Sequence, residues 1–252
     1  MIEKLASIYR IECGLSLPGN LETISIPGLA GKQMPAAMHA VQTEEGLVLI
    51  DPFNLSCETT RQLEAIGTPG HVLITNLNHD RDAMDYRRRY GAKIWGHRDL
   101  SNYFKFKFDF VFDDGDTVPG DLEAILLPGT FRGETVFLDS REGGSLIAGD
   151  AIFNVNLDEF GLAGNAMGAI GWPDGLSTMP RFLMRDEKRA IKSYEKLLER
   201  DFTRIFMTHG KPVLDDAKAP LRTALKEYRS VIPFFMRRAA ARISSNIWEV
   251  MP

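Results

Sequence analysis

The sequence predicts an α/β fold: a four-layer αββα sandwich of two mixed β-sheets with helices on the outer faces. Strand-like runs occur in both halves of the chain, a helical segment follows each group of strands, and turn residues separate the runs. No internal repeat or low-complexity linker interrupts the 252 residues. We therefore expect one domain over residues 1–252, with a C-terminal helical extension at about 217–252.

Strands are expected wherever apolar side chains alternate or run together between turn residues. In the first half these runs cover residues 8–15, 21–26, 38–43, 47–50, 72–75 and 92–96. In the second half they cover residues 122–127, 135–138, 145–148 and 204–208. Helical periodicity with start or stop signals covers residues 56–66, 83–90, 185–199 and 219–243.

Two segments do not follow these patterns. Five phenylalanines alternate over 103–112, which predicts an extended segment with one aromatic face that covers the core. Stacking on single-stranded nucleic acid and a dimer or pocket wall are the alternatives for this face. The glycine-rich stretch 154–179 is weakly periodic, and we expect it to be a loop that shapes a pocket.

Composition excludes several classes of protein. The net charge of −4 gives no general attraction to nucleic acid or to an anionic membrane, so neither is an expected partner. No apolar run approaches the ~18 residues that span a bilayer, and no signal peptide is visible. Two distant cysteines give no disulfide framework. We expect a cytoplasmic protein whose partner is an unknown small molecule, with a homodimer as one candidate assembly.

Polar residues gather where predicted strands end. The run over 72–75 stops at Thr75-Asn76-Leu77-Asn78-His79-Asp80-Arg81, and a helix follows at once. A strand that ends in a polar turn and opens a helix is where α/β folds place their chemistry. Further polar strand ends are Ile50-Asp51-Pro52, Pro128-Gly129-Thr130, Gly149-Asp150 and Thr208-His209-Gly210.

These strand ends, in this order, resemble the motifs of the metallo-β-lactamase superfamily, which carries Thr-His-x-His-x-Asp-His at the first of them. The resemblance implies the αββα sandwich and a hydrolytic site between the sheets. In the superfamily one metal is held by three histidines, and the second is held by an Asp, two histidines and a shared Asp. Paired metals activate a water that attacks a carbonyl or phosphoryl group.

Most of the motif histidines are replaced in this chain. Asn76, Asn78 and Thr130 stand where the resemblance places the three histidines of the first metal, and Arg81 replaces one histidine of the second. Three second-metal positions are kept, and the predicted catalytic residues are Asp80, Asp150 and His209. Asp51 either supports the site as a hydrogen-bond acceptor or caps the following helix.

Three metal states are open. The preferred one holds no metal, with Arg81 pointing inward to pair with Asp80 and Asp150. The alternative is one divalent metal (Zn, Fe or Mn) bound by Asp80, Asp150 and His209. Two metals are least favoured, because Asn and Thr are poor substitutes for imidazole. His79 is expected to point away from its neighbours, as alternation along an extended turn requires.

Three functions follow from these states. The preferred one is a superfamily protein with a degraded metal site that binds a small molecule or partner. The alternative is a mono-metal hydrolase of a small ester or thioester that uses Asp80, Asp150 and His209. The third is a structural subunit with an oligomer interface built from 104–112 and the helix around Pro233. The sequence has no Gly-x-Ser-x-Gly elbow, Walker loop or dinucleotide fingerprint.

Overall fold

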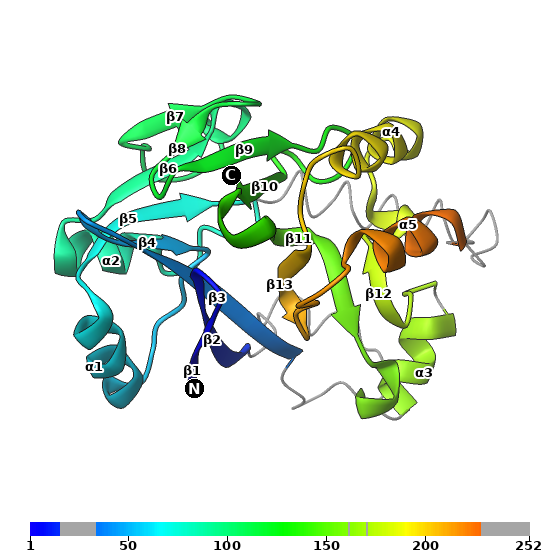
Figure 1. Cartoon of the computed structure of the whole chain (residues 1–252), viewed down its shortest axis with the longest axis horizontal. Helices are drawn as coiled ribbons and strands as arrows, with labels where there is room; N and C mark the ends of the chain where they lie inside the picture. The colour runs from blue at the N-terminus through cyan, green and yellow to red at the C-terminus, as the bar shows by residue number, and fades with distance from the viewer. Residues whose placement is uncertain (16–33, 161, 170, 228–252) are drawn as a thin grey trace.

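The computed structural model describes residues 1–15, 34–160, 162–169 and 171–227; the strand predicted over 21–26 lies outside these ranges. In the described residues two mixed β-sheets pack face to face, and helices cover their outer faces (Figure 1). The predicted four-layer sandwich is confirmed. No described helix is both long enough and apolar enough to cross a membrane.

The first sheet has seven strands in the described residues, ordered as they follow in the chain. They are β1 (Ile2–Leu5), β2 (Ile8–Leu15), β3 (Met34–Thr43), β4 (Gly46–Ile50), β5 (Pro69–Ile74), β6 (Lys93–His97) and β7 (Phe110–Phe112). β1 to β4 are antiparallel neighbours, whereas β4 to β7 run parallel. Because β4 and β5 are parallel, the residues that follow them lie at the same edge of the sheet.

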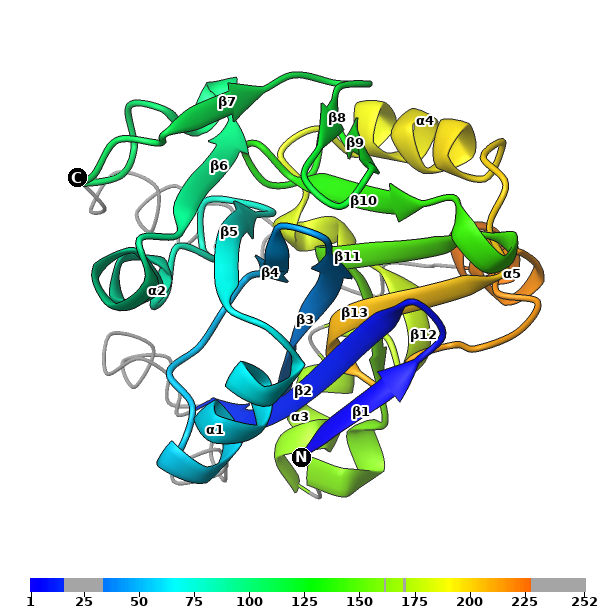
Figure 2. The same ribbon diagram turned by 60° about the vertical axis from the view of Figure 1, so that its left-hand side comes forward.

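The second sheet has the order β12-β11-β10-β9-β8 in the described residues, and β13 pairs with β11. Its strands are β8 (Thr117–Val118), β9 (Leu122–Leu126), β10 (Thr135–Asp139), β11 (Ser145–Val155), β12 (Gly175–Thr178) and β13 (Arg204–Gly210). β13 runs parallel to β11, and the other pairs are antiparallel. β13 also lies beside β3 of the first sheet (Figure 2).

Three apolar layers follow from the alternation of side chains along each strand. In β4, Val48 and Ile50 face the layer between the sheets, whereas Leu47 and Leu49 face outward. The outward layer of the first sheet packs on α1 (Cys57–Ile66) and α2 (Ala83–Tyr90). The outward layer of the second sheet packs on α4 (Glu187–Leu197) and α5 (Lys218–Glu227).

Local signals set the ends of the first two helices. Ser56 caps α1, because its Oγ accepts a hydrogen bond from the amide of Thr59 at 3.1 Å. Gly91 ends α2 with φ of 72°, a left-handed conformation that glycine adopts without steric cost. Asp82 precedes α2, but its carboxylate accepts hydrogen bonds from Asn54 instead of capping the helix.

Part of the aromatic face predicted over 103–112 does cover the core, but the backbone is not extended for most of this segment. Only Phe110–Phe112 form a strand, and residues 103–106 lie in turns and bends. Phe104, Phe106 and Phe108 contact one another and pack on the outer layer of the first sheet. Burial of these rings outweighs an extended backbone, because each ring removes a large apolar area from water.

Two boundaries in the second half also differ from the prediction. The strand expected to stop before Gly149-Asp150 continues as β11 to Val155, with an irregularity between Ala148 and Phe153. The stretch 154–179 is not a single loop, because α3 (Leu162–Ala169) and β12 lie within it. α5 accounts for the start of the predicted helix over 219–243, and residues from 228 onward, including Pro233, lie outside the described ranges.

Candidate functional site

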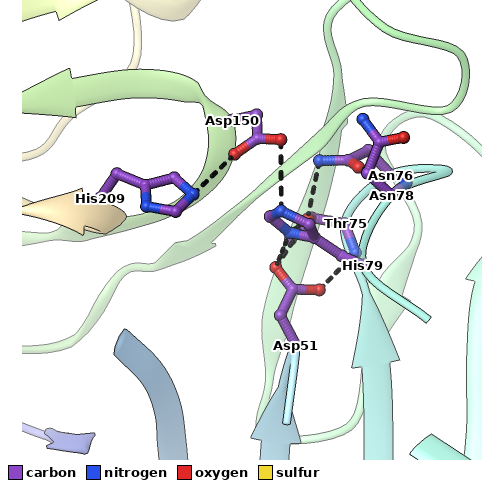
Figure 3. A network of polar contacts seen from close by, with 7 residues as sticks. All are labelled: Asp51, Thr75, Asn76, Asn78, His79, Asp150 and His209. Atoms are coloured by element: carbon purple, nitrogen blue, oxygen red, sulfur yellow. Dashed lines mark hydrogen bonds and ion pairs between the residues drawn. The ribbon is translucent and has the colours of Figure 1, made fainter. Parts of the chain in front are cut away.

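Residues from four places in the chain meet at one edge of the sandwich. Asp51 follows β4, the turn 75–81 follows β5, Asp150 lies in the irregular part of β11, and His209 lies near the end of β13 (Figure 3). The first two come from the first sheet and the last two from the second. The cluster is therefore assembled across the interface between the two sheets.

Asp51 organises the side of the cluster that belongs to the first sheet. One carboxylate oxygen accepts a hydrogen bond from the Thr75 amide at 2.9 Å, and the other accepts one from the Thr75 hydroxyl at 2.7 Å. The second oxygen also lies 2.7 Å from Nδ1 of His79. The φ of Asp51 is 51°, an uncommon conformation for a residue with a side chain. Asp51 therefore supports the site as an acceptor rather than capping a helix, since Ser56 caps α1.

His79 connects the two sheets. With Nδ1 turned to Asp51, its Nε2 lies 3.2 Å from Oδ2 of Asp150. Nε2 of His209 lies 3.5 Å from Oδ1 of the same carboxylate (Figure 3). Each of the three residues offers one ligand atom, and these atoms lie within 4.8 Å of one another. Two imidazoles and a carboxylate are a donor set that suits zinc, iron or manganese.

The prediction that His79 points away from the cluster is wrong. Alternation holds only along an extended chain, but the backbone folds into a tight turn at this point. The amide of His79 donates to the carbonyl of Asn76 at 3.2 Å, and the amide of Asn78 donates to the Asn76 side chain at 2.8 Å. This turn, together with Asp51, directs the imidazole inward.

Two side chains that the sequence placed at the first metal, Asn76 and Thr130, make local hydrogen bonds instead. Asn76 is fully buried, and its amide group stabilises the turn by accepting from Asn78 and donating to Thr75 at 3.4 Å. Thr130 donates its hydroxyl hydrogen to the carbonyl of Leu127 at 2.5 Å. These hydrogen bonds are local, so Asn76 and Thr130 stabilise backbone turns around the cluster.

Asp80 and Arg81 complete the turn but lie differently from His79. Among the described residues, the group that could hold a metal does not include Asp80, whose carboxyl is half-buried and whose pKa is raised by burial. The Arg81 guanidinium stacks over the Phe53 ring, 4.2 Å from its centroid. The φ of Arg81 is 28°, so the backbone is strained beside the cluster.

The charged groups of the cluster shift the pKa values of His79 and Asp150 in opposite directions. Burial and the charge of Arg81 lower the pKa of His79, but the carboxylates of Asp150 and Asp51 outweigh them and raise it to about 9. Burial disfavours the charged form of Asp150, yet His79 and His209 hold the pKa of this carboxyl well below its usual range. At neutral pH the metal-free cluster therefore contains an imidazolium between two carboxylates.

A close approach of the two sheets shapes the cluster. A Cβ atom added at Gly149 would lie 2.2 Å from Oγ1 of Thr75, so only glycine lets β11 pass the end of β5 at this distance. The carbonyl of Thr75 also accepts a hydrogen bond from the amide of Thr135 at 2.8 Å. These contacts place Asp150, the next residue of β11, opposite His79.

The sequence profile of the metallo-beta-lactamase superfamily matches residues 33–163, which is more than half of the 252 residues. The chain belongs to this superfamily. The matched region contains the turn 75–81, Thr130 and Asp150, whereas His209 lies beyond it. The resemblance seen in the sequence motifs is confirmed.

Solved structures from the superfamily share the fold at low identity. A metallo-beta-lactamase from Pontibacter korlensis gives a TM-score of 0.58 at 15% identity and covers 90% of this chain and 99% of its own. One from Hirschia baltica gives 0.57 at 14% identity and covers 90% and 95%. The class B3 di-zinc metallo-beta-lactamase LRA-12 from an Alaskan soil metagenome gives 0.51 at 13%, covering 77% and 85%. No curated protein sequence matches the chain.

Sequence reasoning missed Glu134, a buried acid next to the superfamily cluster. It is fully buried directly before β10, and its carboxyl makes no side-chain hydrogen bond in the described residues, although the backbone of Ala151 interacts with it. Burial, the charge of Asp150 and the charge of Asp51 raise the pKa of Glu134 well above its usual range. An acidic residue directly before the apolar strand 135–138 was the signal available in the sequence.

Proposed function

We propose that this chain binds one divalent metal ion through His79, Asp150 and His209 and hydrolyses a small ester or thioester there. The observation that carries the proposal is the orientation of His79. Its Nδ1 lies 2.7 Å from Asp51, which leaves Nε2 directed at Asp150. Histidines that ligate metals usually donate their other ring hydrogen to a carboxylate in this way.

A weakly satisfied acceptor in the cluster supports the same proposal. Oδ1 of Asp150 is buried and makes no short hydrogen bond in the described residues, and Nε2 of His209 lies 3.5 Å from it. Buried polar atoms are nearly always satisfied, and an ion is one of the accepted explanations for an exception. The three donors therefore fit a metal ion of the kind that takes nitrogen and oxygen ligands and keeps open positions for water and substrate.

The remaining residues have definite tasks in this proposal. A bound metal would supply a water of lowered pKa and polarise the substrate carbonyl. Asp51 fixes the ring of His79, with Thr75 as a second partner of the same carboxylate. Arg81 brings a permanent positive charge to the cluster, which favours substrates that carry or develop negative charge.

A metal-free ligand-binding protein is the second candidate. It is favoured by the protonation of His79, whose pKa of about 9 makes it a cation at neutral pH. This imidazolium neutralises Asp51 and Asp150 without a metal, whereas the sequence predicted Arg81 as the cation that pairs with Asp80 and Asp150. The two candidates differ in whether a metal displaces the proton.

Metal content separates the candidates. Protein purified without chelator is analysed by elemental analysis and then titrated with Zn²⁺, Fe²⁺ or Mn²⁺. We expect about one metal per chain, lost in His79→Gln, Asp150→Asn and His209→Gln but retained in Asp80→Asn. Hydrolysis of model esters and thioesters should follow the metal content.

Other outcomes are equally informative. Loss of metal in Asp80→Asn with retention in His79→Gln would restore the ligand set Asp80, Asp150 and His209. Absence of bound metal in the wild-type protein under all three titrations would favour the metal-free binder. Metal binding without esterase or thioesterase activity would remove the proposed substrate class.

A further inference from the structure

Arg10 is a buried charge that the proposed reaction does not use. It lies in β2 two residues after Ile8, which faces the layer between the sheets, so alternation turns its side chain inward as well. Only 3% of the residue is exposed. Burying a guanidinium is strongly unfavourable unless its donors are satisfied, so the partners of Arg10 indicate its role.

The partners of Arg10 are backbone carbonyls at the end of β13. Nη1 donates to the carbonyl of Met207 at 3.0 Å, and Nη2 donates to the carbonyl of Gly210 at 2.7 Å. These carbonyls belong to residues on either side of Thr208 and His209. One guanidinium thus holds the strand segment that presents His209, from the opposite sheet and 197 residues away in sequence for the first contact.

The β-ladder that this segment forms with β11 is irregular just before His209. The β11–β13 register runs to the pair Ala148 and Met207 and resumes at Phe153 and His209. β11 therefore has four residues between these pairs, where β13 has only one. Asp150 lies in this irregular stretch of β11. The same distortion therefore directs the Asp150 carboxylate into the cluster and interrupts the β-ladder beside His209.

The contact with His39 suits a side chain at position 10 that is positively charged and only donates hydrogen bonds. Its Nε2 lies 3.4 Å from Nη1 of Arg10, and its ring packs edge-on against Phe206 of β13. Because a guanidinium cannot accept a hydrogen bond, Nε2 must be the acceptor and His39 must be neutral. Burial and the charge of Arg10 accordingly hold the pKa of His39 well below its usual range. On the other side Nε of Arg10 contacts Glu12 at 3.3 Å.

We propose that Arg10 is a positioning residue for His209, through the two backbone carbonyls that flank it. This inference rests on the proposed metal site, since His209 is one of its ligands. A planar guanidinium can bond two separated carbonyls in a fixed geometry, whereas an ammonium presents a single point charge. The N-terminal strands thereby set the position of a ligand that comes from the last strand of the second sheet.

The test compares Arg10→Met and Arg10→Lys with a matched control, Arg204→Met. Arg204 lies at the opposite end of β13 and donates to Ser145 Oγ and to the carbonyl of Glu142. Arg204→Met removes similar hydrogen bonds but leaves the contacts of the segment around His209 in place. Two readouts are used: the Zn²⁺ dissociation constant, and the ring ¹H–¹⁵N signals of His209 in metal-free protein, assigned with His209→Gln.

We expect Arg10→Met to weaken Zn²⁺ binding about 10–100-fold, as loss of outer support for a ligand usually does. Arg10→Lys should lie between Arg10→Met and wild type, and Arg204→Met should bind like wild type. The His209 signals should move in Arg10→Met and stay in place in Arg204→Met. If Arg10→Met does not fold, Arg10→Lys decides by the same two measurements.

Failure of the inference and failure of the metal proposal give different results. Wild-type affinity and unmoved His209 signals in a folded Arg10 variant would overturn the positioning role, whatever the metal does. A wild-type protein that binds no Zn²⁺ would overturn the metal proposal, and the metal-free His209 signals would then decide the role of Arg10 alone. Equal shifts in the Arg10 and Arg204 variants would reduce Arg10 to general support of β13.

Discussion

Nδ1 of His79 lies 2.7 Å from Oδ2 of Asp51, and both side chains are only 2% exposed. This pair joins the end of β4 to the turn after β5. Through its other nitrogen the same ring reaches Asp150 of the second sheet at 3.2 Å. One imidazole therefore connects carboxylates from both sheets, and its protonation and orientation decide what the cluster can bind.

Asp51→Asn tests whether this pair orients a metal ligand. The amide keeps the shape of the carboxylate but is a weaker acceptor for the His79 ring. We expect the Zn²⁺ dissociation constant to rise about 10–100-fold, measured by calorimetric titration. Asp139→Asn is the control, because this buried carboxylate pairs with Ser7 and Arg141 instead. Unchanged affinity in Asp51→Asn would mean that Asp51 does not support a ligand.

The stability of metal-free protein should fall at alkaline pH because His79 loses its proton. Its pKa is about 9 in the folded protein against an ordinary 6.5, so the ion pairs contribute fully below pH 6.5 and are lost as the pH rises through 9. A shift of this size corresponds to about 3 kcal/mol in the free energy of unfolding.

Urea unfolding in the presence of chelator measures this loss. Wild-type protein should be less stable at about pH 9.5 than at about pH 6.5, and His79→Gln should show a smaller change. His71→Gln serves as the control, because burial lowers the pKa of His71 instead of raising it. A steep alkaline loss that persists in His79→Gln would assign it to another group.

Glu134→Gln should stabilise the protein at neutral pH. Burial raises the pKa of Glu134 in the folded state, so this group destabilises the fold increasingly as the pH rises above its ordinary value of 4.5. A neutral amide removes that effect, so Glu134→Gln should unfold at a higher urea concentration than wild type at about pH 7.5.

The comparison with Glu134→Ala separates charge from packing. The alanine variant removes the acid but also leaves a cavity, so it should be less stable than Glu134→Gln by about 1–3 kcal/mol. At about pH 5 the glutamine variant and wild type should be similar. A glutamine variant that is less stable and binds metal more weakly would show that Glu134 is ionised and takes part in the site.

Arg81→Gln should tighten metal binding. The Arg81 charge lowers the pKa of both His79 and Asp150, which shows that its field reaches the cluster. Removing a cation whose field reaches the metal ligands relieves repulsion of a divalent ion, and we expect an affinity gain of about 3–10-fold at low salt. Arg87→Gln is the control, because its guanidinium pairs with Asp109 and not with the cluster. Weaker metal binding in Arg81→Gln would assign Arg81 a supporting role.

Local sequence signals determined much of the fold. The helix predicted over 83–90 has these bounds in the structure, because a polar turn starts it and Gly91 ends it with a left-handed backbone. Apolar alternation and apolar runs located most of the strands, and the order of motifs identified the superfamily. The resemblance to the superfamily also placed Asp150 and His209 in one site. The helix bounds and the strand positions depend on neighbours a few residues apart, so they are readable from the chain alone.

Only the tertiary structure decided which side chains converge. His79 turns inward because of a bond to Asp51, 28 residues earlier, and not because of its place in the motif. The roles of Glu134 and Arg10 could not be assigned from the sequence for the same reason, because the groups that surround them come from segments far away in sequence. The direction of a side chain on a tight turn is set by long-range hydrogen bonds and burial, and residue periodicity contains neither.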